Sequence, residues 1–111
     1  MVPKKPFFRL LDVKRTAQRK DGLLLSRTKA EASFPNLTEA LAAARSMIES
    51  LAENDFVETK QQWDLCDVYA VVIAKQGWYV KLTLLPDRVI LISFHLLERP
   101  LRTARGHEVK P

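Results

Sequence analysis

The stretch DVYAVVIAKQGWYVKLTLLPDRVILISFHLL, residues 67–97, decides the fold. It holds three apolar runs rich in Val, Ile, Tyr and Phe, separated by short polar segments at Lys75–Gly77 and Pro86–Arg88. Apolar runs of this composition, bounded by turn-forming residues, are typical of β-strands. We therefore expect the stretch to form a three-stranded antiparallel meander.

The register of the second hairpin determines which side chains share a face of the sheet. A two-residue loop needs a positive φ at its first central residue, which Pro86 cannot adopt, so we expect a three-residue loop. The expected pairs are Leu85 with Val89, Thr83 with Leu91, Lys81 with Ser93, and Tyr79 with His95. Because side chains alternate along a strand, one face becomes wholly apolar, with Val80, Leu82, Leu84, Ile90, Ile92 and Phe94. The other face is mainly polar, with Tyr79, Lys81, Thr83, Ser93 and His95.

The remaining segments complete one small α/β (α+β) domain spanning residues 1–111, with its helices packed on one face of a small antiparallel sheet. Apolar residues at helical spacing predict helices over 7–20 and 37–52, the first ended by a left-handed Gly22 and the second capped by Asn36. We expect an edge strand or an extended link at 23–26 and a brief helical turn at 27–34. Residues 1–6 are expected to be a mobile arm and 98–111 a loose basic tail.

Two junction residues and the second helix complete the predicted core. The apolar stripe of that helix should lie across the apolar face of the meander, through Leu41, Ala44, Ile48 and Leu51. Phe56 is expected to anchor the passage from helix to sheet. Trp63 is expected either in the core or as a partial surface anchor.

Composition limits the class of protein. The hydrophobic fraction of 47% and charged fraction of 28% are those of a soluble globular domain, and no apolar run is long enough for a membrane span. The first residues lack the apolar core of a signal peptide, so we expect a cytoplasmic protein. One cysteine, Cys66, and two histidines make an internal disulfide impossible and a metal site within the chain improbable.

Charge is distributed unevenly along the chain, which carries a formal net charge of +5. Residues 1–30 hold nine Lys or Arg against two acids, residues 31–74 two against eight, and residues 75–111 seven against three. Basic segments attract phosphate backbones without reading sequence, although the same charges can simply form a solvated surface. The asymmetry favours contact with nucleic acid.

The polar face suggests a reaction that needs no metal. RNA can be cleaved by its own 2′-hydroxyl if a base, an acid and a cation surround the phosphate. His95 offers an acid or base, Lys81 a cation, and Tyr79 a hydrogen bond or a stacking surface. The alternative is that His95 is a satisfied structural residue of a strand. His107 is a weaker candidate, and Cys66 is interpreted as a small hydrophobic residue.

Several short motifs, in order, resemble the MqsR-type toxins of bacterial type II toxin–antitoxin modules. These motifs are Arg9-Leu10 with Val13-Lys14, Ile48 and Leu51 before Asp55-Phe56, Asp67-Val68-Tyr69, Tyr79-Val80-Lys81, and Ile92-Ser93-Phe94. The resemblance covers most of the chain and implies a RelE-like fold and an endoribonuclease that cleaves messenger RNA without a cofactor. It also implies a cognate antitoxin partner, often with a zinc-binding domain, which would hold the zinc.

The chain departs from that family at the chemistry. Where the family has Tyr-Lys-Ser after the Asp-Phe pair, this chain has Val57-Glu58-Thr59, and Lys60 is the candidate to replace the lysine. Cys66 stands in place of a glutamine and His95 in place of a lysine, while Tyr79 is unchanged. The expected catalytic residues are thus His95, Tyr79, Lys81 and Lys60. The expected RNA-binding residues are Arg88, Arg99, Arg102 and Ser93.

Two other functions remain open from the sequence. One is a non-catalytic module that binds RNA or DNA and acts with a partner protein. The other is an adaptor that docks proteins through the acidic helix and the basic tail. Cleavage of RNA in the presence of EDTA distinguishes the enzyme from both alternatives.

Overall fold

The computed structural model describes residues 5–26, 34–61 and 64–111. Within these ranges the chain forms two α-helices, a short 3₁₀ helix and seven strands. In chain order they are α1 (Leu10–Gln18), β1 (Leu23–Leu25), α2 (Leu37–Ser50), η1 (Glu53–Asp55), β2 (Phe56–Gln61), β3 (Leu65–Ile73), β4 (Gln76–Leu84), β5 (Val89–Leu96), β6 (Leu101–Arg102) and β7 (Glu108–Val109).

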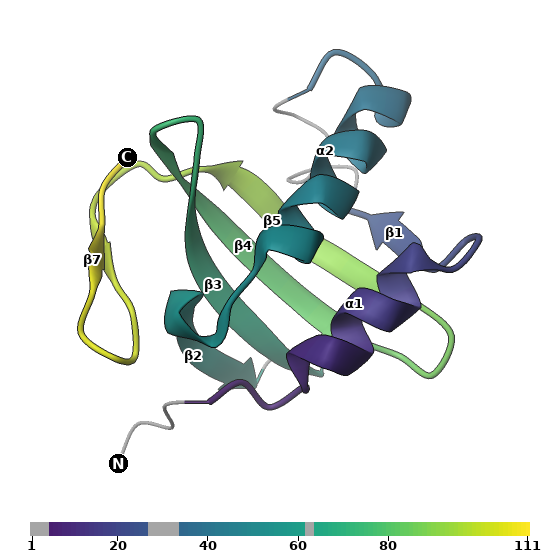
Figure 1. Ribbon diagram of the computed structural model, residues 1–111, viewed down its shortest axis with the longest axis horizontal. Helices are drawn as coiled ribbons and strands as arrows, with labels where there is room; N and C mark the ends of the chain where they lie inside the picture. The colour runs from purple at the N-terminus through teal and green to yellow at the C-terminus, as the bar shows by residue number, and fades with distance from the viewer. Residues whose placement is uncertain (1–4, 27–33, 62–63) are drawn as a thin grey trace.

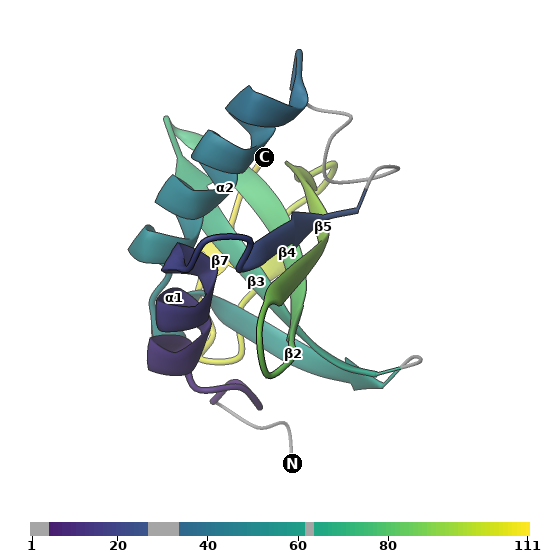
Figure 2. The ribbon, with the colours of Figure 1, turned by 90° about the vertical axis from the view of Figure 1, so that its right-hand side faces the viewer.

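Five strands form the main sheet, in the order β1-β5-β4-β3-β2, and both helices lie on the same side of it (Figures 1 and 2). The expected α+β class, the helices on one face and the edge strand at 23–26 are confirmed. The purely antiparallel sheet is wrong, because β1 pairs in parallel with β5. Between these two strands the chain passes through α2 and the rest of the meander, and β5 then runs in the same direction as β1.

Helix α2 forms where the sequence predicts it. The Asn36 side chain accepts a hydrogen bond from the Glu39 backbone N–H at 2.9 Å, as expected of an N-cap. Its buried face holds Ala40, Ala44, Met47 and Ile48, at the i, i+4, i+7, i+8 spacing of one helical face. These residues form one core with the sheet side chains Tyr69, Val80, Leu82, Val89, Leu91 and Phe94.

The residue with a left-handed conformation after α1 is not the one predicted. The left-handed residue is Asp21, with φ 58°, rather than Gly22. Gly22 is required for another reason, since a Cβ there would lie 2.0 Å from the Thr16 carbonyl oxygen. The tight passage from α1 into β1 thus depends on both residues.

A β-bulge in β5 changes which of its side chains point into the core. Tyr79 pairs with His95 and Lys81 with Ser93, as predicted, but the register then shifts so that Leu82 pairs with Leu91. The expected pairs Thr83–Leu91 and Leu85–Val89 are therefore wrong, and Val89 and Leu91 enter the core. The predicted core residues Ile90 and Ile92 are only partly buried.

Two further elements around the meander were not predicted correctly. Residues 56–61 form β2, which pairs with β3 through a register shift near Val57, and Phe56 is fully buried as expected. The turn before β4 lies at Ala74 and Lys75, with φ of 51° and 67°, and not at residues 75–77. Gly77 belongs to β4.

The C-terminal segment is an ordered hairpin rather than a loose tail. Strands β6 and β7 pair with each other, and the Ala104 N–H donates to the Phe56 carbonyl at 2.8 Å. A Cβ on Gly77 would lie 2.2 Å from the Lys110 carbonyl oxygen, so the end of the chain packs directly on β4. The hairpin, in yellow in Figure 1, forms a second small core on the face of the sheet opposite the helices, with Val57, Val68, Ala70, Leu97 and Val109.

Some expectations fall outside the described residues. These are the helical turn in 27–33, the burial of Trp63 and the mobility of residues 1–4. No helix in the described part is long and apolar enough to cross a membrane.

Candidate functional site

Tyr79 and His95 form the centre of the candidate site. They are paired residues of β4 and β5, and their rings stack with centroids 5.2 Å apart and planes inclined by 16°. Both side chains are half-buried and project from the face of the sheet opposite the helices. The pairing predicted from sequence is therefore confirmed, and it brings a phenol against an imidazole.

The contacts of His95 define its chemistry. Its Nδ1 lies 2.9 Å from the Leu96 carbonyl oxygen. Because a carbonyl only accepts hydrogen bonds, this contact requires a proton on Nδ1. In the neutral ring, Nε2 then carries the lone pair and is the nitrogen that can take a proton from a substrate.

A pocket of about 220 Å³ opens beside the stacked pair. Its walls are Tyr79 and His95 from the sheet and a run of residues from the end of β5 to β6, namely Leu97, Glu98, Arg99 and Leu101. The C-terminal hairpin therefore completes the site. Arg99, predicted to bind RNA, lies in this pocket with its cationic side chain exposed.

The next row across the same face holds three polar residues and one buried valine. In this row Glu58, Val68, Lys81 and Ser93 stand on four successive strands. Lys81 and Ser93 therefore lie one row from Tyr79 and His95, as the sequence predicted. Ser93 is 2% exposed, so it can take part only as a buried supporting hydroxyl and not as an open RNA-binding surface.

Lys60 does not lie in this row. It projects from the same face, opposite Cys66 on β3. Three strand spacings and four positions along the strands separate it from His95, which is roughly 20 Å at ~4.8 Å per strand and ~3.3 Å per residue. At this separation the Lys60 and His95 side chains do not reach the same phosphate.

Two of the predicted RNA-binding arginines are held by other groups. Arg88 donates to the neighbouring Asp87 carboxylate at 3.0 Å, in the turn at the far end of β4 from Tyr79. This contact holds the pKa of the exposed Asp87 carboxyl below its ordinary value. Arg102 donates to the Gly106 carbonyl at 3.0 Å within the hairpin. Neither lines the pocket beside the stacked rings.

Cys66 fits its interpretation as a small hydrophobic residue. It is 2% exposed, and burial raises the pKa of its thiol, although the nearby Lys81 ammonium acts in the opposite direction. A thiol kept protonated is a poor nucleophile. The described residues bring together no cluster of three or more His, Cys, Asp or Glu side chains that could hold a metal ion.

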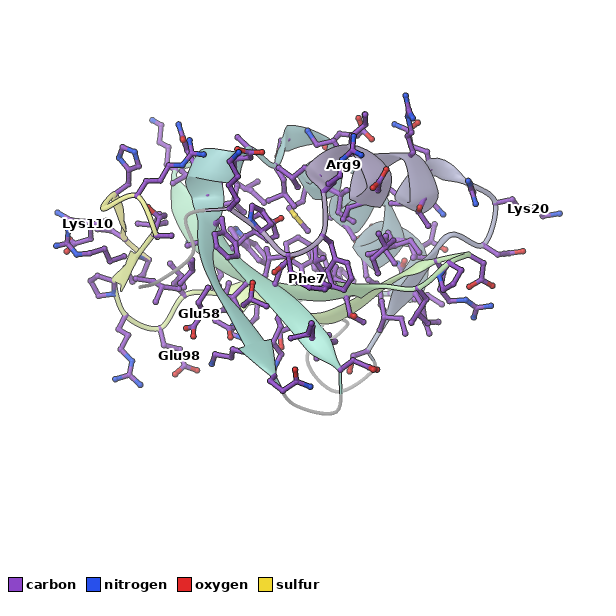
Figure 3. The ribbon with its side chains drawn as sticks, turned by 90° about the horizontal axis from the view of Figure 1, so that it is seen from below. Phe7, Arg9, Lys20, Glu58, Glu98 and Lys110 are labelled. Atoms are coloured by element: carbon purple, nitrogen blue, oxygen red, sulfur yellow. The ribbon has the colours of Figure 1, made fainter. Side chains whose placement is uncertain are left out.

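Sequence reasoning missed two glutamates on this face. Glu58 comes from β2, which was not recognised as a strand, and Glu98 lines the pocket from the segment expected to be loose. Figure 3 shows both on the side of the sheet away from the helices. A strand assignment for residues 56–61 would have placed Glu58 in the correct row.

Comparison with known proteins does not identify the chain. No model of a known protein family matches it, and a search of curated proteins gives no significant match. The functional assignment therefore depends on the geometry of the site and on the motifs of the sequence.

Proposed function

We propose that this protein is an endoribonuclease that cleaves messenger RNA through the RNA 2′-hydroxyl and acts as the toxin of a toxin–antitoxin module. One observation carries the proposal: an imidazole with its Nε2 lone pair available is stacked on a tyrosine, beside an arginine-lined pocket. The resemblance to MqsR-type toxins, with their RelE-like fold, supports the toxin role. The antitoxin partner with a zinc-binding domain is inferred from that resemblance alone.

The proposed reaction is an in-line displacement at phosphorus. His95 Nε2 takes the proton from the 2′-hydroxyl, and the 2′-oxygen attacks the adjacent phosphorus. The bond from phosphorus to the 5′-oxygen breaks, and the leaving oxygen receives a proton from the Tyr79 hydroxyl or the Lys81 ammonium. Arg99 and Lys81 stabilise the negative charge that develops on the phosphorane. The products are a 2′,3′-cyclic phosphate and a 5′-hydroxyl.

A second candidate is an RNA-binding module without catalysis. The position of Lys60, roughly 20 Å from His95 by strand and residue spacing, favours it. The stacked rings and Arg99 would then bind a base and a phosphate without cleaving the chain. This candidate shares the binding surface of the first and differs in the fate of the RNA.

Incubation of the purified protein with end-labelled RNA in EDTA tests the proposal. Cleavage that leaves 2′,3′-cyclic phosphate and 5′-hydroxyl ends supports the nuclease. RNA that is bound but intact supports the binding module. Absence of both binding and cleavage contradicts both functions.

A further inference from the structure

Glu98 is a charged residue of the candidate site that the proposed reaction does not use. It lines the pocket of about 220 Å³ together with Tyr79, His95 and Arg99. Among the described residues, neither its side chain nor that of the neighbouring Arg99 forms a hydrogen bond or an ion pair. The pocket therefore offers a ligand an unpaired carboxylate as well as an unpaired guanidinium.

The position of Glu98 is set by the residues on both sides of it. The Leu97 N–H donates to the Gly77 carbonyl at 2.9 Å, and the Leu97 side chain is buried in the second small core. On the other side, Leu101 packs against the same core and pairs with Val109. Glu98 thus lies in a short connection between two anchored leucines, on the face of the sheet away from the helices (Figure 3).

The carboxylate of Glu98 can bind only some of the groups that RNA presents. It accepts hydrogen bonds and donates none, and it repels the phosphates. Adenine, cytosine and guanine each carry an exocyclic amine that donates hydrogen bonds, whereas uracil has carbonyl oxygens and no amine. The ring N–H of uracil lies between two of these oxygens, which repel a carboxylate. Glu98 therefore favours a base with an exocyclic amine over uracil.

The pocket also determines which nucleotide is selected. Its aromatic wall is the stacked pair of Tyr79 and His95, against which a base can pack. The base and the 2′-hydroxyl are attached to adjacent carbons of one ribose, so a base held beside His95 brings its own 2′-hydroxyl to that side chain. The selected nucleotide is therefore the one on the 5′ side of the bond that is cut.

We propose that Glu98 is a specificity residue, which accepts a hydrogen bond from the exocyclic amine of the base on the 5′ side of the cut. The protein then cleaves RNA after adenosine, cytidine or guanosine in preference to uridine. This inference rests on the proposed function, because it takes the RNA cleaved beside His95 as the ligand. A hydrogen bond to a charged acceptor should give a preference of about 10- to 100-fold.

Cleavage of the dinucleotides ApA, CpA, GpA and UpA tests the site, because all four release the same nucleoside. Relative to the uncatalysed rates, kcat/KM of the wild type for UpA should be about 10- to 100-fold below that for the other three. The amide of Glu98→Gln can both accept and donate, so this variant should cleave UpA faster than the wild type does. Glu108→Gln, at an exposed glutamate of β7 that does not line the pocket, is the matched control and should keep the preference.

The dinucleotides also separate this inference from the proposed function. If the wild type cleaves all four equally, or if Glu98→Gln keeps the preference, the Glu98 site is wrong while the nuclease stands. If the wild type cleaves no RNA, the nuclease fails, and binding of the 2′-O-methyl dinucleotides tests the base site alone. Weaker binding of the uridine compound would then support the base site, and equal binding of all four, or none, would contradict it.

Discussion

The ring of Tyr79 lies over the ring of His95, with centroids 5.2 Å apart, because two irregularities between β4 and β5 compensate for each other. The turn pairs Leu84 with Val89 and so is one residue longer than expected. The bulge beyond Lys81 then adds one residue to β5, which restores the predicted pairing of Tyr79 with His95. The geometry of the site therefore depends on the bulge.

The bulge predicts unequal costs for neighbouring core substitutions. Leu91 is fully buried under the helices, and Ile92 is only partly buried. Leu91→Ala should lower the free energy of unfolding by about 2–5 kcal/mol, and Ile92→Ala by clearly less. Denaturant unfolding of both variants measures this difference. Equal losses, or a larger loss for Ile92→Ala, would mean that β5 has the regular register.

Gly77→Ala should release the end of the C-terminal hairpin. The added Cβ would meet the Lys110 carbonyl oxygen at 2.2 Å and Leu97 Cδ1 at 2.7 Å, and the backbone atom cannot move aside without the strand. We expect a loss of about 1–3 kcal/mol in the free energy of unfolding. Hydrogen exchange should show reduced protection in residues 101–110. Unchanged protection there would contradict the packing of the chain end on β4.

Tyr69 predicts a loss of stability in alkali. Burial raises the pKa of its phenol above the ordinary value of 10.0, so the folded state keeps a proton that the unfolded state releases. The contribution of Tyr69 to the free energy of unfolding is therefore constant below pH 10. As the pH rises further, the free energy of unfolding falls. Tyr69→Phe should reduce this slope. A wild-type slope retained in Tyr69→Phe would assign the alkaline loss to other groups.

Tyr69→Phe should be tolerated at neutral pH. The Tyr69 hydroxyl is buried and has no hydrogen-bond partner among the described residues. Its removal should leave the free energy of unfolding unchanged or raise it by about 1 kcal/mol. A clear loss of stability would reveal a partner for the hydroxyl.

Substitutions of two arginines in the C-terminal segment should have different effects. Loss of Arg105 should affect stability, and loss of Arg99 should affect RNA binding. Arg105 donates to Glu53 at 3.0 Å and to Asn54 at 2.6 Å, whereas Arg99 lines the pocket beside Tyr79. Arg105→Ala should lower the free energy of unfolding by about 0.5–1 kcal/mol and hardly change RNA affinity. Arg99→Ala should weaken RNA binding and reduce its salt dependence by about one charge, without loss of stability. Salt titrations of both variants measure this, and reversed effects would exclude Arg99 from the phosphate path.

Local periodicity was enough to predict the helices and their packing. The cap at Asn36 and the buried positions Ala40, Ala44 and Ile48 follow from the spacing of residues along one helix. The pairings of Tyr79 and Lys81 were also predicted, but from a shorter turn than the real one, and they hold because the bulge compensates for the extra residue of the turn. The cap and the buried face of the helix depend only on residues that are close together in the sequence.

The other features depend on distant contacts or on ambiguous patterns. Residues 89–92 are all apolar, so either register buries apolar side chains and the bulge leaves no signal in the sequence. A similar register shift near Val57 interrupts the alternation of side chains between the two faces of β2, so the sequence shows no regular strand pattern there. The hairpin around Gly106 was predicted to be loose because the residues that hold it, Gly77 and Phe56, lie far away in the sequence.

The single-turnover rate of RNA cleavage by His95→Ala, in EDTA, tests the proposed mechanism most directly. His107→Ala is the matched control, since His107 is an exposed histidine of the hairpin that does not line the pocket. If His95 transfers the proton, His95→Ala should lower the rate by about 100- to 10,000-fold, with a far smaller change in RNA affinity, and His107→Ala should cleave normally. Cleavage by His95→Ala at the wild-type rate would contradict the catalytic role of the stacked pair.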